Sequence, residues 1–365
     1  MKHIVVLGST GKIGKAVLEI VRAYKNEFKI IGLSTNKNKD LLREQIQEFK
    51  PLAVGVGEKD LVTLASMQQA DMVVVAVVGM SGLAPTLAAI RKGKDIALAT
   101  KEVLVVAGDL VMKEARKHNA NIVPIDSEHS ALFQSLQSGR KNEIKRLILT
   151  MGKGPIAKMK KKELRNVTIK DIRNRPVWDM GSKIMIDSAT CLNKSFEVIE
   201  ARWLFEVSPE QISIVVHPEY ICHSLVEYKD GSIITELGTP DMKRYIQYAL
   251  FYPKRKEMRV TKGIDLVGKK LSFEKAPFEK FPGLHLGFDA IKKGGTMPAV
   301  LHGADEAAVK SFYDEEIAFV DIPQVIKNTM DSHEVTQNPT LKNILEAEIW
   351  AQTYARSFIS QMKNE

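Results

Sequence analysis

The sequence lacks several features that would place it in a specialised class of proteins. It has only two cysteines, Cys191 and Cys222, and their spacing matches neither a metal-binding motif nor a disulfide framework. The N-terminus, MKHIVVLGSTGKIG, has an apolar run of only about five residues, too short for a signal peptide or a membrane span. We therefore expect a cytoplasmic protein that has no membrane partner.

A patterned basic surface of the kind that binds nucleic acid is also missing, although the net charge is +9. The basic residues are spread along the chain and are not interleaved with aromatic residues. The one dense run, KMKKKELR at 158–165, is typical of a solvated helix face. The charge thus favours small anionic ligands, and we expect no nucleic-acid partner.

What the sequence does contain is a regular alternation over its first 150 residues. Short, β-branched apolar runs that suit strands buried on both faces occupy 3–8, 29–34, 52–57, 72–79, 96–100 and 121–125. Amphipathic stretches that suit helices lie between them, at 15–26, 40–50, 82–93 and 109–119. This alternation predicts an α/β fold with a Rossmann-like, doubly wound parallel sheet.

The first predicted strand ends in GSTGKIG, which contains Gly8, Gly11 and Gly14 and opens into a helix. Glycines at such a turn allow a close backbone approach, and the helix N-terminus offers free N–H groups to a pyrophosphate. In this position the loop predicts binding of a dinucleotide.

The end of the second predicted strand indicates which dinucleotide binds. An enzyme that uses NAD usually has an acidic residue there, but this chain reads LSTNKNKD, and Asp40 comes too late. Ser34, Thr35, Lys37 and Asn38 suit a 2′-phosphate, which favours NADP(H). A polar turn before the next helix would explain the same residues without a ligand.

The segment PIDSEHS, residues 124–130, places two carboxylates two positions apart. In an extended segment Asp126 and Glu128 would point to the same side and could clamp a metal ion. Alternatively, Asp126 caps the following helix and Glu128 lies in its first turn. Because ligands bind beyond the carboxyl ends of parallel strands, Lys101, Glu102 and Ser127 are expected to converge there with the two carboxylates.

A second group of polar residues follows at 175–205, where a helix is predicted from about Ser188. Asn193 and Glu197 are four residues apart on it, next to Lys194. Ser188, Asn193 and Lys194 could bind a phosphate, and Glu197 could join Asp126 and Glu128 in a set of hard oxygen ligands for Mg²⁺ or Mn²⁺. Each of these residues could instead be an ordinary polar residue of a helix surface.

Taken together, the motifs closely resemble the signature segments of the 1-deoxy-D-xylulose 5-phosphate reductoisomerase family. These segments are GSTGKIG, ATKE (99–102), PIDSEHSALFQ (124–134), DSATCLNKSFEVIEA (187–201), HSLVEYKDGSIITELGTPDM (223–242) and GGTMPAVL (294–301). The resemblance implies an enzyme that uses NADPH and a divalent metal to convert this sugar phosphate into 2-C-methyl-D-erythritol 4-phosphate, an isoprenoid precursor. It also implies a homodimer.

The resemblance assigns roles to matching positions. It implies metal binding by Asp126, Glu128 and Glu197, with Lys101 as a further catalytic residue. It implies substrate binding by Ser127, Gly152, Arg175, Trp178, Met180, Ser188, Asn193 and Lys194, where Trp178 and Met180 belong to a lid. It implies cofactor binding by Gly8, Thr10, Gly11, Lys12, Ile13, Gly14, Asn36, Lys37, Asn38, Thr100 and Glu102.

The family fold also implies a division of the chain. An NADPH-binding domain would span 1–148, a central α/β catalytic domain with the lid 149–258, a linker 259–284, and a C-terminal helical domain 285–365. The stretches 321–332 and 341–362 read as C-terminal helices. His217 and His223 are expected in strands and not at a metal.

Several positions depart from the family pattern. Where the family has Ser-Gly-Gly-Pro in a phosphate-binding loop, this chain has Gly-Lys-Gly-Pro at 152–155. Arg175 replaces a lid histidine, Thr100 an asparagine and Lys12 a serine; Lys153 and Arg175 add cations that could compensate. Two alternatives therefore stay open: an NADP-dependent reductase of a different sugar phosphate, and a weakly active or regulatory NADPH-binding paralogue.

Overall fold

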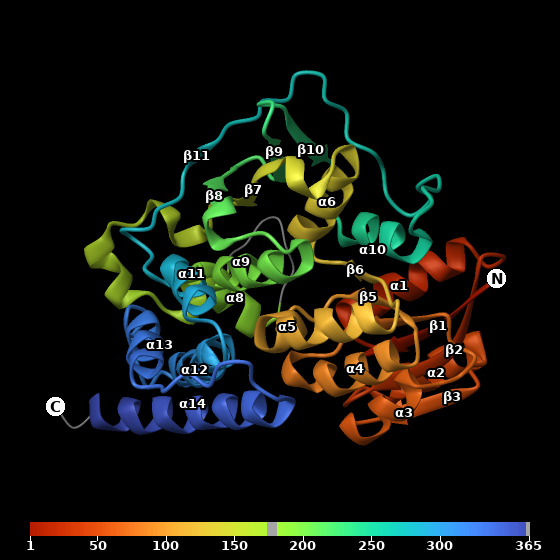
Figure 1. Cartoon of the computed structure of the whole chain (residues 1–365), viewed down its shortest axis with the longest axis horizontal. Coiled ribbons are helices and arrows are strands. Elements are labelled where there is room, and N and C mark those ends of the chain that lie inside the picture. Colours follow the sequence, from red (N-terminus) through yellow and green to blue (C-terminus); the bar gives the residue numbers. More distant parts are fainter. Residues whose placement is uncertain (174–180, 363–365) are drawn as a thin grey trace. The chain divides into compact units, whose positions relative to one another are not determined.

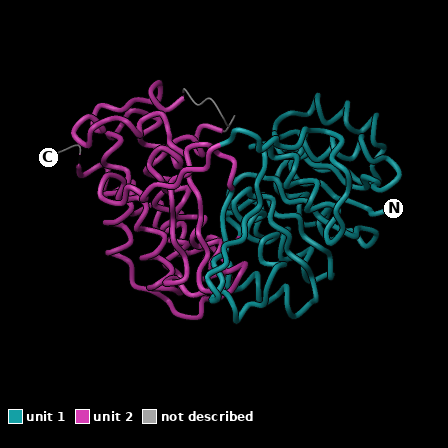
Figure 2. The backbone as a smooth tube through the Cα atoms, turned by 90° about the horizontal axis from the view of Figure 1, so that it is seen from above, with its two compact units in different colours: residues 1–103, 108–144, 223–269 teal, residues 104–107, 145–222, 270–365 magenta. Residues whose placement is uncertain are grey.

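The computed structural model describes residues 1–173 and 181–362, which divide into two compact units. Unit 1 comprises residues 1–103, 108–144 and 223–269, and unit 2 comprises 104–107, 145–222 and 270–365 (Figure 2). These units group residues 223–258 with the N-terminal sheet, whereas the predicted domains place them in the catalytic segment. The division into domains by function stays a prediction.

Unit 1 is built around the predicted parallel sheet, which is confirmed. The sheet has six strands in the order β3-β2-β1-β4-β5-β6 (Figure 1). Its strands are β1 (Lys2–Leu7), β2 (Phe28–Thr35), β3 (Ala53–Val56), β4 (Met72–Val75), β5 (Asp95–Leu98) and β6 (Ile122–Pro124). All neighbouring strands run parallel, and the apolar runs of β1, β2, β4, β5 and β6 are largely buried, as two-sided strands require, whereas Val54 of the edge strand β3 is exposed.

The segments between these strands form helices, as the amphipathic pattern predicts. The α-helices of unit 1 up to residue 144 are α1 (Lys12–Ala23), α2 (Lys39–Phe49), α3 (Leu61–Ala65), α4 (Leu83–Arg91), α5 (Glu102–Lys117) and α6 (Ser127–Ser135). Short 3₁₀ helices are η1 (Glu58–Asp60), η2 (Gly79–Gly82), η3 (Leu136–Ser138) and η4 (Lys141–Glu143). The helix α3 was not among the predicted helices, because five residues are too short to show a periodicity.

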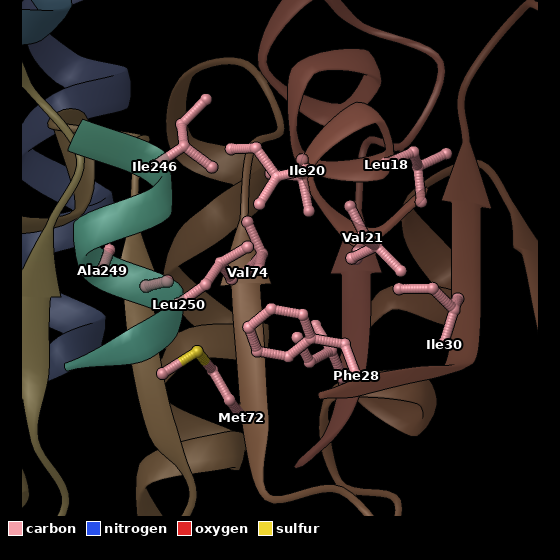
Figure 3. Close-up of a cluster of buried hydrophobic side chains, with 14 of the residues drawn as sticks. Leu18, Ile20, Val21, Phe28, Ile30, Met72, Val74, Ile246, Ala249 and Leu250 are labelled. Carbon is pink, nitrogen blue, oxygen red and sulfur yellow. The ribbon is translucent and has the colours of Figure 1, made fainter. Parts of the chain in front are cut away.

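Residues 223–269 join unit 1 through a hydrophobic core. They contain all of β9 (Cys222–Tyr228) but its first residue, together with β10 (Ile233–Leu237) and α10 (Met242–Phe251). In Figure 3, Ile246, Ala249 and Leu250 of α10 lie beside Ile20 of α1 and Val74 of β4. All five side chains are completely buried. Burial of this apolar area stabilises the sheet, and it explains why a segment far along the chain belongs to this unit.

Unit 2 combines a few strands with most of the C-terminal helices. Strand β7 (Ile144–Met151) pairs in parallel with β8 (Ile212–Val216), which pairs antiparallel with β11 (Glu274–Lys275). The α-helices are α7 (Ile169–Arg173), α8 (Ser182–Ala189), α9 (Leu192–Phe205), α11 (Gly283–Lys293), α12 (Met297–Tyr313), α13 (Asp321–Asp331) and α14 (Leu341–Met362). The 3₁₀ helices are η5 (Pro155–Lys158), η6 (Lys161–Asn166) and η7 (Pro209–Gln211).

The helices of unit 2 confirm one prediction and correct another. Helices α13 and α14 lie where C-terminal helices were predicted. The helix predicted from about Ser188 exists as α9, but it begins at Leu192, and Ser188 lies on the separate helix α8, which ends at Ala189. Cys191 between them has a φ of 66°, a left-handed conformation that interrupts a helix. Among the helices of the described residues, none has the length and apolar character that crossing a membrane requires.

Candidate active site

The turn between β1 and α1 has the backbone geometry predicted for GSTGKIG. Gly8 has a φ of 84°, and the Gly11 N–H donates to the Gly8 carbonyl at 3.0 Å. A Cβ atom at Gly8 would lie 2.3 Å from the Ala76 carbonyl oxygen, and one at Gly14 would lie 2.3 Å from the Gly8 carbonyl oxygen. Both obstacles are backbone atoms, so the turn requires glycine at these two positions.

The end of β2 supports this turn from inside the protein. The Gly8 N–H donates to Ser34 Oγ at 3.0 Å, and Ser9 Oγ donates to Gln45 Oε1 at 2.6 Å and lies 3.1 Å from the Ser34 carbonyl. Ser34, Ser9 and Gln45 are buried. The prediction that Ser34 faces a 2′-phosphate is therefore wrong, because its hydroxyl holds the glycine turn. The role of Gln45 in α2 gave no local signal in the sequence.

The residues after Ser34 differ in their exposure to solvent and in their contacts. Thr35 is buried, and its Oγ1 lies 2.6 Å from Thr10 Oγ1, so it too supports the turn instead of facing outward. Asn38 caps α2 by accepting from the Leu41 N–H at 3.1 Å. Asn36 and Lys37 are exposed. Lys37 is thus an exposed cationic side chain of this turn.

At the end of β5, Thr100, Lys101 and Glu102 lead into α5. The Thr100 hydroxyl donates to the Val77 carbonyl at 2.6 Å, which ties this turn to the end of the neighbouring strand β4. Lys101 occupies the N-cap position of α5, and its Nζ lies 2.6 Å from Asp126 Oδ2. The carboxyl ends of β5 and β6 therefore bring Lys101 and Asp126 together, as predicted.

The carboxylates of PIDSEHS are brought together in a different way from the predicted one. Helix α6 begins at Ser127, so Asp126 is its N-cap residue and the alternation of an extended segment does not apply. Among the described residues, the Asp126 side chain forms no capping hydrogen bond to α6. A carboxylate oxygen of Asp126 lies within 4.8 Å of one of Glu128, which also accepts from Ser127 Oγ at 2.5 Å. A pure capping role for Asp126 is thus not supported.

His129, to which the sequence prediction gave no role, belongs to the same cluster. It is completely buried, and its Nδ1 lies 3.9 Å from Asp126 Oδ2. The only signal in the sequence was its place directly after Glu128. His129 is thus a buried residue beside Asp126 and not part of an exposed helix surface.

In unit 2, α9 carries the second group of predicted residues. Lys194 and Glu197 are buried and form an ion pair. Asn193 Nδ2 also donates to Glu197 Oε1 at 2.5 Å, while Lys194 Nζ donates to the Thr150 carbonyl at 2.5 Å. Since a buried carboxylate is costly without such donors, these residues form a built polar cluster and not an ordinary helix surface.

Ser188 lies on α8, which a buried ionic network fixes in place. Lys183 Nζ lies 2.8 Å from Asp187 Oδ2 and forms a second ion pair with Asp305 of α12. Burial, and next the Asp305 carboxylate, raise the pKa of Asp187 to about 8. Ser188 itself is half-buried, and its hydroxyl donates to the Ile184 carbonyl at 2.7 Å.

The loop after β7 holds the most informative departure from the family pattern. A Cβ atom at Gly152 would lie 1.9 Å from Cζ of the Tyr220 ring, so the ring fills the space that a serine side chain would need. Lys153 Nζ pairs with Glu274 Oε1 of β11 at 2.7 Å. The expectation that Lys153 compensates for the lost serine is therefore not supported. Arg175, Trp178 and Met180 lie outside the described residues.

Family models match most of the chain. A model described as 1-deoxy-D-xylulose 5-phosphate reductoisomerase matches residues 4–60 and 52–108. Models of C-terminal domains of the same enzyme match residues 122–205 and 237–354.

Individual relatives match over the full length. A 1-deoxy-D-xylulose 5-phosphate reductoisomerase of Pelodictyon phaeoclathratiforme is 46% identical, over 99% of this chain and 100% of the relative. A solved structure of the Zymomonas mobilis enzyme in complex with NADPH is 36% identical, covers 98% of this chain and 99% of its own, and has a TM-score of 0.90. A solved complex of DOX-P reductoisomerase with NADPH, fosmidomycin and magnesium is also 36% identical, covers 100% and 99%, and has a TM-score of 0.93. This chain belongs to the 1-deoxy-D-xylulose 5-phosphate reductoisomerase family.

Proposed function

We propose that this protein isomerises and reduces 1-deoxy-D-xylulose 5-phosphate to 2-C-methyl-D-erythritol 4-phosphate, with NADPH as the reductant and a divalent metal as cofactor. The observation that carries the proposal is the full-length match to relatives of that name. The reaction belongs to the non-mevalonate route to isoprenoids. As the family implies, we further propose that the enzyme acts as a homodimer in the cytoplasm.

The β1–α1 turn is the proposed site for the NADPH pyrophosphate. Its glycines bring the backbone of the turn close together at the start of α1, and the N–H groups of a helix N-terminus bind phosphate well. We assign cofactor binding to Gly8, Thr10, Gly11, Lys12, Ile13, Gly14, Asn36, Lys37, Asn38, Thr100 and Glu102. Exposed Lys37 would pair with the 2′-phosphate, which distinguishes NADPH from NADH.

We propose that Asp126, Glu128 and Glu197 hold Mg²⁺ or Mn²⁺. Their carboxylate oxygens are hard ligands, and this set suits these ions better than zinc. When bound, such an ion supplies Lewis-acid stabilisation of negative charge that develops on substrate oxygens. Lys101, 2.6 Å from Asp126, would hold that carboxylate in position and contact the substrate.

The phosphate of the substrate would lie against unit 2. Ser188, Asn193 and Lys194 are the proposed phosphate ligands, and the charge of Lys194 is suited to this role because it sits among hydrogen-bonded groups of α9 and β7. Ser127 would contact the sugar. Gly152, Arg175, Trp178 and Met180 are retained as proposed substrate-binding positions from the family.

One alternative is favoured by a specific observation. The loop at 152–155 lacks the family's serine and has the Tyr220 ring against Gly152, so a reductase of a related sugar phosphate would also fit these residues. A comparison of kcat/KM for 1-deoxy-D-xylulose 5-phosphate with that for other ketose phosphates distinguishes the two.

Turnover tests the proposal directly. With 1-deoxy-D-xylulose 5-phosphate, NADPH and Mn²⁺, the wild type should oxidise NADPH, and a chelator should stop the reaction. Asp126→Asn should lower kcat by about a thousandfold, while the Kd of NADPH changes by less than about twofold. Asp109→Asn is a matched control, because Asp109 forms an exposed ion pair on α5, with its Oδ2 2.7 Å from Lys113 Nζ. Full activity in the presence of the chelator would contradict the metal assignment.

A further inference from the structure

Tyr220 and Gly152 fit together in a way that nothing in the local sequence predicts. Tyr220 lies just after β8 and has a φ of 53°, an uncommon backbone conformation for a residue with a large side chain. Its ring lies where a side chain at position 152 would begin. Its hydroxyl donates to the Lys153 carbonyl at 3.1 Å, so the phenol reaches the backbone of the same loop.

The turn that carries Tyr220 is held by a set of hydrogen bonds around His217. The His217 N–H donates to the Met151 carbonyl at 2.7 Å, which joins the turn to the end of β7. The His217 ring lies 2.9 Å from the Ser272 carbonyl through Nδ1 and accepts from the Ile221 N–H at 3.1 Å through Nε2. These contacts are mutually consistent when Nδ1 carries the proton. The backbone that presents Tyr220 is therefore fixed on both sides.

Two donors from distant parts of unit 2 meet the short stretch 150–153. Lys194 Nζ donates to the Thr150 carbonyl at 2.5 Å, and the Tyr220 hydroxyl donates to the Lys153 carbonyl. Lys153 contributes only its backbone here, because its ammonium group pairs with Glu274. The Tyr220 hydroxyl is thus a side-chain donor that lies at the loop itself.

We propose that Tyr220 is a substrate-binding residue, whose hydroxyl donates to the substrate phosphate in place of the serine that the family has at position 152. This inference rests on the proposed function and refines its phosphate site. The hydroxyl has a single proton, so binding of the phosphate transfers its donation from the Lys153 carbonyl to a phosphate oxygen. The half-exposed position of Tyr220 lets water satisfy that carbonyl. Gly152 is then required because the ring occupies its side-chain space.

Tyr220→Phe tests the inference, because it removes the hydroxyl and keeps the ring. We expect KM for 1-deoxy-D-xylulose 5-phosphate to rise about tenfold or more, as for loss of a hydrogen bond to a charged group. The Kd of NADPH should change by less than about twofold. Tyr313→Phe, at an exposed tyrosine of α12, is the matched control and should leave KM unchanged.

A double-mutant cycle tests whether the Tyr220 hydroxyl takes the place of the family's serine or has only a structural role. In the Gly152→Ser background the ring must move away and a serine hydroxyl is available, so Tyr220→Phe should raise KM by less than about threefold. A wild-type KM in Tyr220→Phe, or an equal effect in both backgrounds, would overturn the inference.

The proposed function can fail separately from this inference. Absence of turnover by the wild type would refute the function, whereas calorimetric titration with inorganic phosphate reports on Tyr220 without turnover. Weaker binding of phosphate by Tyr220→Phe, by about tenfold, supports the inference, and equal binding contradicts it.

Discussion

Two glycine-containing turns of this protein look similar in the sequence but are built differently. In the β1–α1 turn, a side chain at Gly8 or Gly14 would meet backbone oxygens at 2.3 Å. In the loop after β7, a side chain at Gly152 would meet the ring of Tyr220. A backbone obstacle cannot move without distorting the fold, whereas a half-exposed ring can rotate. The first turn is thus fixed by its own backbone, and the second by a distant side chain.

This difference decides what each turn tolerates. The cofactor turn is closed by contacts among neighbouring strands of one sheet, so any L-residue at Gly14 should harm it. The phosphate loop depends on one partner, so a change there can be reversed by changing the partner. The two turns therefore predict different responses to the same kind of substitution.

The largest expected effect comes from Gly14→Ala, which places a methyl group against the Gly8 carbonyl. Overpacking of this kind costs about 1–3 kcal/mol, so the Kd of NADPH should rise by up to about a hundredfold. This Kd is measured by titration, with the fluorescence of the bound nicotinamide as the signal. Gly263→Ala is the control, since its Cβ position has no heavy atom within 4 Å among the described residues. Unchanged NADPH affinity in Gly14→Ala would remove the basis for the comparison.

A smaller effect is expected from Gly152→Ala, because the Tyr220 ring can move. We expect KM for 1-deoxy-D-xylulose 5-phosphate to rise about tenfold, through displacement of the hydroxyl, with NADPH binding unchanged. Circular dichroism should show an intact fold. An unfolded Gly152→Ala variant would mean that the ring is as rigid as a backbone obstacle, and that the two turns do not differ.

Lys37→Ala probes the cofactor side without touching its glycines. Loss of the exposed cation should raise the Kd of NADPH about fivefold to tenfold and leave that of NADH unchanged. Paired titrations with the two cofactors check this. An equal effect on both would argue against a 2′-phosphate contact.

The smallest effect is expected from Lys153→Gln. Lys153 and Glu274 are both about half-exposed, and such pairs contribute at most about 1 kcal/mol to stability. KM for the substrate should change by less than about threefold. A large rise in KM would show that Lys153 binds the phosphate, and would weaken the role proposed for Tyr220.

The fold of unit 1 could be predicted because its signals are local. Each strand of the parallel sheet is a short apolar run, and the glycine turn follows the first strand directly. The break at Cys191 could not be predicted, because a left-handed cysteine has no sequence signature. The prediction for Ser34 failed for a similar reason: whether a serine faces solvent or a neighbouring turn depends on the tertiary structure.

The site residues also divide into those with a local signal in the sequence and those without one. Lys101 and Asp126 could be placed together because parallel strands end at one edge of a sheet. The hydrogen bond from Tyr220 to Lys153 joins residues 67 positions apart, and no periodicity or motif connects them. Residues that are held in place by a strand or a short turn were therefore predictable. Residues that are held in place only by tertiary packing were missed.

The most direct test measures the Kd of NADPH and the KM of the substrate in two variants. The account predicts a crossed pattern: Gly14→Ala raises the Kd of NADPH by up to about a hundredfold, and Tyr220→Phe raises only the KM of the substrate by about tenfold. The Kd is measured by titration and the KM at saturating NADPH. If Tyr220→Phe weakened NADPH as much as the substrate, or if Gly14→Ala left NADPH binding intact, the separate construction of the two turns would be contradicted.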